Sequence, residues 1–69
     1  MEKVLFSKKI PIERKIFFLD LIETDNGNYL KLTEKRNNIR NTVKIPDSGL
    51  SELQSVFEEI IRFTNRDKI

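Results

Sequence analysis

The sequence predicts an α+β fold in which a four-stranded antiparallel sheet is followed by one C-terminal helix. Four segments between residues 3 and 45 alternate apolar and polar side chains with the period of a β-strand, and short polar turns separate them. After Pro46 the apolar residues change to helical spacing. The 69 residues can form one domain at most. That domain is expected to be marginally stable, because a chain this short buries only about 60% of its unfolded surface.

The first two strands are predicted at about residues 3–10 and 15–24. In the first, Val4, Phe6 and Ile10 alternate with Leu5 and polar residues, and Pro11 closes the strand. The second is rich in β-branched and aromatic residues, which favour strands.

Two more strands are predicted at about residues 28–36 and 39–45. Asn26 and Gly27 precede the third, and this pair tolerates the positive φ of a two-residue hairpin turn. A polar turn at residues 36–38 leads into the fourth strand. The resulting antiparallel meander is expected to be covered on one face and open to water on the other. The inward side chains are Phe17, Leu19, Leu21, Leu30, Leu32, Ile39, Val43 and Ile45.

The helix is predicted at about residues 48–64, with Ser48 as its N-cap and Asp47 beside the positive end of its dipole. Its apolar residues span about 160° at 100° per residue, wider than the ~100° needed to cover one sheet. We therefore expect the helix to contact both its own sheet and a second surface. The stripe consists of Leu50, Leu53, Val56, Phe57, Ile60, Ile61 and Phe63.

The composition argues against catalysis and metal binding. The chain has no cysteine and no histidine, so thiolate ligands and the commonest general base are absent. Asp20, Glu23 and Glu34 are the carboxylates near the open side or edges of the sheet, and Asp20 is expected to pair with a neighbouring cation. We expect no enzyme activity, cofactor, metal or small-molecule substrate. No apolar run is long enough to cross a membrane, and the missing cysteines permit a cytoplasmic location.

The open face of the sheet combines aromatic rings with positive charge. Residues 1–45 contain ten basic and six acidic residues, a net charge of +4, whereas residues 46–69 carry −2. Tyr29 and Lys31 lie on the open face with Phe18, Arg40 and Lys44. Single-stranded nucleic acid uses such surfaces, because bases stack on rings and phosphates pair with cations. A cross-strand cluster that only shields the sheet is the alternative.

The segment RKIFFLDLIETDNGNYLKLTE, residues 14–34, resembles the characteristic segment of the PUR repeat of the purine-rich element-binding (Pur-alpha) family. The family pattern is approximately KRFYLDVKQN, two further residues, then GRFLKIAE. Ser7, Lys8 and the predicted helix also fit, so the resemblance covers nearly the whole chain. The matching positions are Lys15, Phe17, Leu19, Asp20, Gly27, Tyr29, Leu30, Lys31 and Glu34.

The resemblance implies a Whirly-like ββββα repeat that is completed by a second repeat through crossed helices. Because this chain carries one repeat, it implies a homodimer, in agreement with the wide helix stripe. It also implies binding of single-stranded DNA and RNA with a purine-rich preference. We therefore expect a role in nucleic-acid regulation, in a protein that is cytoplasmic by its composition and could be nucleoid-associated. The expected dimer-interface residues are Leu53, Val56, Phe57, Ile60, Ile61 and Phe63.

The resemblance also implies particular nucleic-acid contacts. Arg14 and Lys15 occupy the family's contact turn, Tyr29 its stacking position, and Lys31 the following cation. Two positions depart from the pattern, since Ile22 replaces a lysine and Thr24 an asparagine. The second hypothesis is a homodimeric protein-interaction module that binds a partner through exposed Phe18, Ile22 and Tyr29. The full predicted nucleic-acid site is Arg14, Lys15, Phe18, Thr24, Tyr29, Lys31, Arg40 and Lys44.

Overall fold

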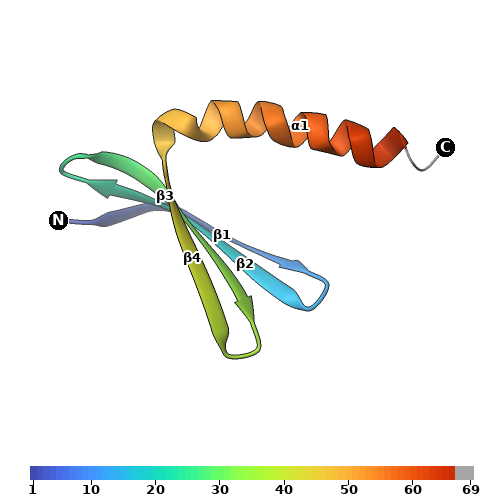
Figure 1. The fold of residues 1–69 in the computed structure, drawn as a ribbon. Coiled ribbons are helices and arrows are strands. Elements are labelled where there is room, and N and C mark those ends of the chain that lie inside the picture. The colour runs from blue at the N-terminus through green and yellow to red at the C-terminus, as the bar shows by residue number, and fades with distance from the viewer. Residues whose placement is uncertain (67–69) are drawn as a thin grey trace.

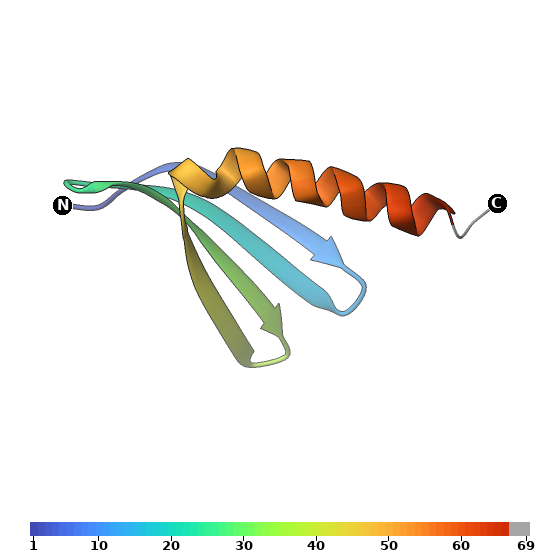
Figure 2. The ribbon, with the colours of Figure 1, turned by 45° about the horizontal axis from the view of Figure 1, so that its top comes forward.

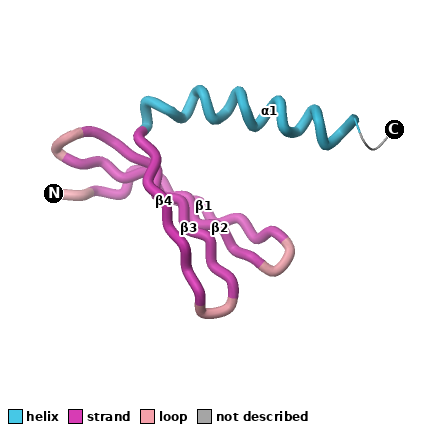
Figure 3. The backbone as a smooth tube through the Cα atoms, viewed as in Figure 1, coloured by secondary structure: helices cyan, strands magenta, loops and turns pink. Residues whose placement is uncertain are grey.

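The computed structural model describes residues 1–66 and confirms the predicted ββββα fold. The strands form one antiparallel sheet in the order β1-β2-β3-β4, and the helix follows β4 (Figure 1; Figure 3). The elements are β1 (Lys3–Ile12), β2 (Lys15–Thr24), β3 (Gly27–Arg36), β4 (Ile39–Pro46), a 3₁₀ turn η1 (Asp47–Gly49) and α1 (Leu50–Arg66).

Strand β1 begins at Lys3 as predicted, but its C-terminal end and its register differ from the prediction. It continues through Pro11 to Ile12, and Pro11 lies opposite Ile16. A proline is tolerated there because β1 is an edge strand, whose outward N–H groups have no strand partner. Near its start the register shifts between Val4 and Phe6, so Val4 lies opposite Ile22 and Phe6 opposite Leu21. Val4 therefore shares the face of Ile22, and the prediction that Val4 and Phe6 lie on the same face is wrong.

The β2–β3 hairpin turns one residue earlier than predicted. Asp25 and Asn26 form the turn, and Gly27, with φ of 127°, is already the first residue of β3. The Thr24 hydroxyl closes this turn, because it accepts a hydrogen bond from the Asn26 amide at 3.2 Å and donates one to the Gly27 carbonyl at 2.7 Å. In the other two hairpins Glu13 and Asn37 both adopt a φ of 56°.

The helix begins later than predicted, and Ser48 is not its N-cap. Strand β4 ends at Pro46, which occupies the cap position of η1 without a side-chain hydrogen bond, and Ser48 lies inside that turn. Because the strand leads directly into η1, the cap falls on a residue whose side chain has no hydrogen-bond acceptor. The α-helix then extends from Leu50 to Arg66.

The helix does not cover the sheet of its own chain. The helical part contacts the sheet mainly where η1 meets β3, and α1 leaves the end of β4 and runs away from it (Figures 1 and 2). The radius of gyration is 14.4 Å, compared with about 11 Å for a compact domain of this length. The expected coverage of one sheet face by the helix is therefore wrong for a single chain.

Candidate nucleic-acid interface

The strand register assigns each side chain to one of two sheet faces. The first, here called the aromatic face, carries Phe18 and Tyr29; the second, the leucine face, carries Leu19, Leu21, Leu30 and Leu32. Directly opposed residues form four rows across the aromatic face. From β1 to β4 they are Val4, Ile22, Tyr29 and Pro46; Ser7, Asp20, Lys31 and Lys44; Lys9, Phe18, Thr33 and Thr42; and Pro11, Ile16, Lys35 and Arg40.

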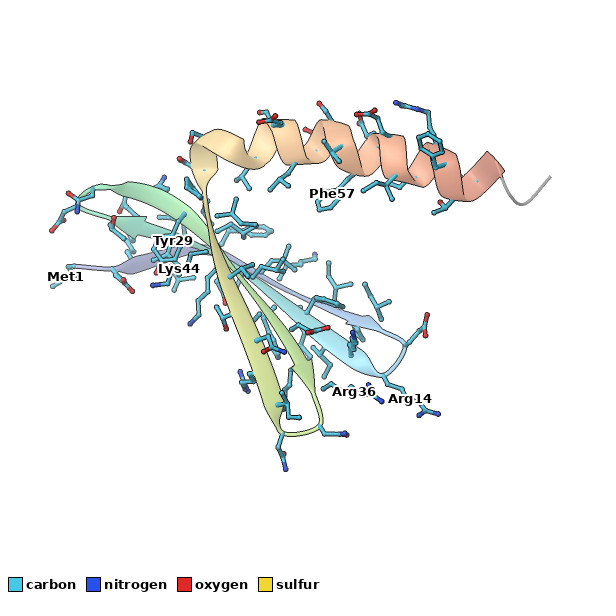
Figure 4. All side chains as sticks on the ribbon, viewed as in Figure 1. Met1, Arg14, Tyr29, Arg36, Lys44 and Phe57 are labelled. Atoms are coloured by element: carbon cyan, nitrogen blue, oxygen red, sulfur yellow. The ribbon has the colours of Figure 1, made fainter. Side chains whose placement is uncertain are left out.

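Each ring of the aromatic face lies beside a cation from β4. The Lys44 ammonium lies 5.2 Å from the centroid of the Tyr29 ring, and both side chains lie near the middle of the molecule in Figure 4. The Arg40 guanidinium lies 5.5 Å from the centroid of the Phe18 ring. The Tyr29 hydroxyl donates to a Glu2 carboxylate oxygen at 3.4 Å, so the half-buried side chain contacts Lys44 over its ring and Glu2 through its hydroxyl. The structure thus brings Phe18, Tyr29, Lys31, Arg40 and Lys44 together.

Two side chains of the central strands β2 and β3 are buried on the aromatic face. Ile22 is 6% exposed and Thr33 is 5% exposed, and they are the buried side chains of the part of the chain that the structure describes. The Thr33 and Thr42 hydroxyls lie 3.2 Å apart and share a hydrogen bond. The hypothesis that an exposed Ile22 binds a partner protein is therefore wrong. Its neighbours in the row are Val4 and Tyr29.

Asp20 has a different partner from the expected one. The Ser7 hydroxyl donates to its Oδ1 atom at 2.5 Å, across the β1–β2 pair. Lys31 lies opposite Asp20 on β3, yet within residues 1–66 no ammonium or guanidinium comes within 4.0 Å of this carboxylate. The expected ion pair of Asp20 is therefore wrong, and a hydroxyl group positions the carboxylate instead.

Arg14 and Lys15 lie apart from the aromatic face. The Lys15 ammonium pairs with a Glu34 carboxylate oxygen at 2.6 Å, and both residues belong to the leucine face by register. The Asn41 amide also donates to Glu34 at 3.5 Å. Hydrogen bonds from Lys15 and Asn41, with the Lys15 charge, hold the pKa of Glu34 below its ordinary value of 4.5.

An open groove of about 630 Å³ lies beside this ion pair, at the end of the sheet where Arg14 and Arg36 are labelled in Figure 4. Arg14 and Lys15 thus flank a second basic surface rather than extending the aromatic face. The groove is lined by Ile12, Glu13, Arg14, Lys15, Phe17 and Arg36.

The sequence reasoning missed three cations of these surfaces. Lys9 and Lys35 lie on the aromatic face, in the rows of Phe18 and Arg40. Lys35 could have been found, because it alternates with Tyr29, Lys31 and Thr33 along one strand. Arg36 lines the groove, although it was interpreted only as part of a turn. Thr24 was included for nucleic-acid contact, but both functions of its hydroxyl are used within the hairpin.

The predicted interface residues of α1 are largely open in the single chain. Val56, Phe57, Ile60, Ile61 and Phe63 are 43% to 64% exposed, whereas Leu53 is half-buried. Apolar residues of the outer strands on the leucine face are also exposed. They are Phe6, Ile10, Ile12, Ile39 and Val43.

Residues 1–66 contain neither a candidate membrane span nor a candidate metal site. None of the helices in that range is long and apolar enough to cross a membrane. Its acidic side chains form no group of three or more that could hold a metal ion.

The chain is similar to known proteins over most of its length. Residues 2–64 match the family model described as PurA ssDNA and RNA-binding protein. The chain is also 42% identical over 53 residues to "Transcription factor Pur-alpha 1" of Arabidopsis thaliana. That alignment covers 77% of this chain and 18% of the relative, so the chain spans about a fifth of the length of that protein.

Proposed function

We propose that this chain, which belongs to the PurA ssDNA and RNA-binding protein family, binds single-stranded DNA or RNA on its aromatic face. One observation carries the proposal, namely that the four rows of the aromatic face combine two aromatic rings with five cations and one carboxylate. Rings accept bases by stacking, and cations pair with the phosphates between the bases. The cations are Lys9, Lys31, Lys35, Arg40 and Lys44.

Binding requires Lys44 and Arg40 to exchange their present contacts. A cation over an exposed ring contributes about 0.5–1 kcal/mol, whereas a base stacked on a ring contributes about 1–3 kcal/mol. The exchange therefore favours the base, and each displaced cation is already beside the position of the neighbouring phosphate. The rings are covered by cations in the free protein and by bases in the complex.

A preference for purines follows from stacking on Tyr29. The hairpin and the hydrogen bond to Glu2 restrict this side chain, so little rotamer entropy is lost when a base stacks on it. A purine overlaps the ring more fully than a pyrimidine does. The name of the Arabidopsis relative, a transcription factor, supports a role in nucleic-acid regulation.

The functional unit is a homodimer in this proposal. The chain exposes 6135 Å², whereas a compact folded monomer of this mass exposes about 4,500 Å². The excess of about 1,600 Å² per chain, doubled for two copies, lies within the roughly 2,000–5,000 Å² that obligate homodimers bury. The exposed apolar residues of α1 and of the leucine face account for the surface to be covered. Crossed helices, each packed on the partner's leucine face, would cover it.

A titration of short single strands tests the proposal. Purine-rich and pyrimidine-rich strands, as DNA and as RNA, are titrated at several salt concentrations while binding is followed by fluorescence anisotropy. We expect purine-rich strands to bind more tightly, and affinity to fall steeply with salt because phosphate contacts release counterions. Absence of binding to any strand would refute the proposed function. A salt-independent affinity would indicate apolar docking and would favour the protein-interaction module instead.

A further inference from the structure

Asp20 is the single carboxylate in the four rows of the basic aromatic face. Asp20 occupies the second row, between Ser7 and Lys31, and is half-buried. On a surface that binds a polyanion, a carboxylate repels phosphate and weakens binding, unless it accepts a hydrogen bond from a donor of the ligand. Within the described residues its hydrogen-bond partner is the Ser7 hydroxyl and not a cation, so charge neutralisation does not account for its position.

We propose that Asp20 reads the bases of the bound strand and selects guanine. This inference rests on the proposed function, since it needs a strand on the aromatic face. A carboxylate only accepts hydrogen bonds. Guanine is the base whose Watson–Crick edge presents two adjacent donors, N1–H and the N2 amine. Adenine and cytosine offer one donor beside an acceptor nitrogen, and uracil and thymine offer one donor between two carbonyls. Any base other than guanine thus brings an acceptor against the carboxylate.

The surroundings of Asp20 suit this role. The Ser7 hydroxyl fixes Oδ1 at 2.5 Å, and a carboxylate has about four acceptor positions, so about three remain for a base. Phe18 lies two residues away on the same strand, about 7 Å along it, and Tyr29 lies in the adjoining row. In this proposal a base stacked on either ring would extend its edge toward Asp20. Lys31, directly opposite, can hold the phosphate and offset its repulsion from the carboxylate.

Base substitutions separate this role from a general charge effect. The probe is a short adenine-rich strand with one guanine, compared with strands in which inosine or adenine replaces it. Inosine keeps N1–H and lacks the N2 amine. A good bidentate contact contributes a discrimination of roughly 5- to 150-fold, so we expect guanine to bind at least several-fold more tightly than adenine, with inosine between them.

The Asp20→Asn variant tests the residue itself. It keeps the shape and an acceptor for the Ser7 hydroxyl, but replaces one carboxylate oxygen by an amide donor. We expect the guanine-to-adenine affinity ratio to fall toward one. Glu23→Gln is the matched control, because it removes the same charge from an exposed residue on the opposite face of β2, and its ratio should equal that of the unmodified protein.

Ser7→Ala should lower the guanine-to-adenine affinity ratio but keep it above one, because the Asp20 carboxylate remains and loses only its hydrogen bond from Ser7. If Asp20→Asn raised affinity for all strands by one factor and left the ratio unchanged, the base-reading role would be overturned. A protein that binds purine strands without distinguishing guanine from adenine would also overturn it, while leaving the proposed function intact. Absence of all binding would refute both.

Discussion

Truncation of Phe57 tests whether a second copy completes the fold. Phe57 lies in the apolar stripe of α1 and is 56% exposed in the single chain (Figure 4). A phenylalanine that buries about 200 Å² when fully covered would therefore still have about 110 Å² to bury. At ~25 cal/mol per Å², covering this area contributes about 3 kcal/mol per chain. With the cavity left by truncation, Phe57→Ala should cost about 3–5 kcal/mol.

The measurement combines sedimentation equilibrium with urea unfolding at several protein concentrations. If two copies fold together, the unfolding midpoint rises with protein concentration, and Phe57→Ala lowers folding and dimerisation together. Arg62→Ala is the matched control, because helical spacing places this exposed residue opposite the centre of the apolar stripe. Its effect should stay within about 0.5 kcal/mol.

A protein that works as a monomer would lose much less stability on truncation of Phe57. In a protein that works as a monomer, more than half of the Phe57 side chain is already in water, and its truncation should cost less than about 1 kcal/mol. A folded monomer whose unfolding does not depend on concentration, together with such a small effect, would refute the argument from exposed area.

Three further predictions address the site and its surroundings. Tyr29→Ala should lose about 1–3 kcal/mol of single-strand affinity and Tyr29→Phe little, because the ring and not the hydroxyl contacts the base; a melting curve shows whether Tyr29→Ala instead acts by unfolding the protein. Lys31→Ala should lower the salt slope by about 0.7 per lost phosphate contact on all single strands, whereas Lys8→Ala, on the leucine face, should leave the slope unchanged in the same titrations. The interactions that lower the pKa of Glu34 stabilise the fold at pH values above its ordinary 4.5, and this stabilisation is lost as the pH falls through the lower pKa of the folded state. In thermal melts, the melting temperature of Glu34→Gln should therefore depend less on acid pH than that of the unmodified protein. An unchanged pH profile would contradict this role of Glu34.

Much of the fold could be predicted because this chain follows local rules in most segments. The alternation in β2, β3 and β4 specifies both faces, and the stripe of α1 specifies a helix with more apolar surface than one sheet can cover. The register shift at Leu5 could not be predicted, since nothing in the alternation of β1 indicates an extra residue. The hairpin turn was misplaced by one residue because Asp25, Asn26 and Gly27 all suit turns.

The candidate site was predicted less completely than the fold. Strand parity groups Phe18, Tyr29 and Lys31 on one face, but it does not choose between hydrogen-bond partners. Asp20 has Ser7 on one side and Lys31 on the other, and only the side-chain geometry of the structure selects the hydroxyl. The assignment of Arg14 and Lys15 to the nucleic-acid site came from a contact turn of the family, and parity separates Lys15 from the aromatic face.

The two faces of the sheet have different structural requirements, and the register of β1 links them. The aromatic face buries Ile22 and Thr33 within the single chain. The leucine face keeps Phe6, Ile39 and Val43 more than half exposed and needs a second surface. Because the side-chain period is two, a one-residue slip would exchange the faces of a whole strand. The shift at Leu5 confines this exchange to the first residues of β1. Val4 thereby packs beside Ile22 on the aromatic face, while Phe6 remains available to the leucine face and its partner.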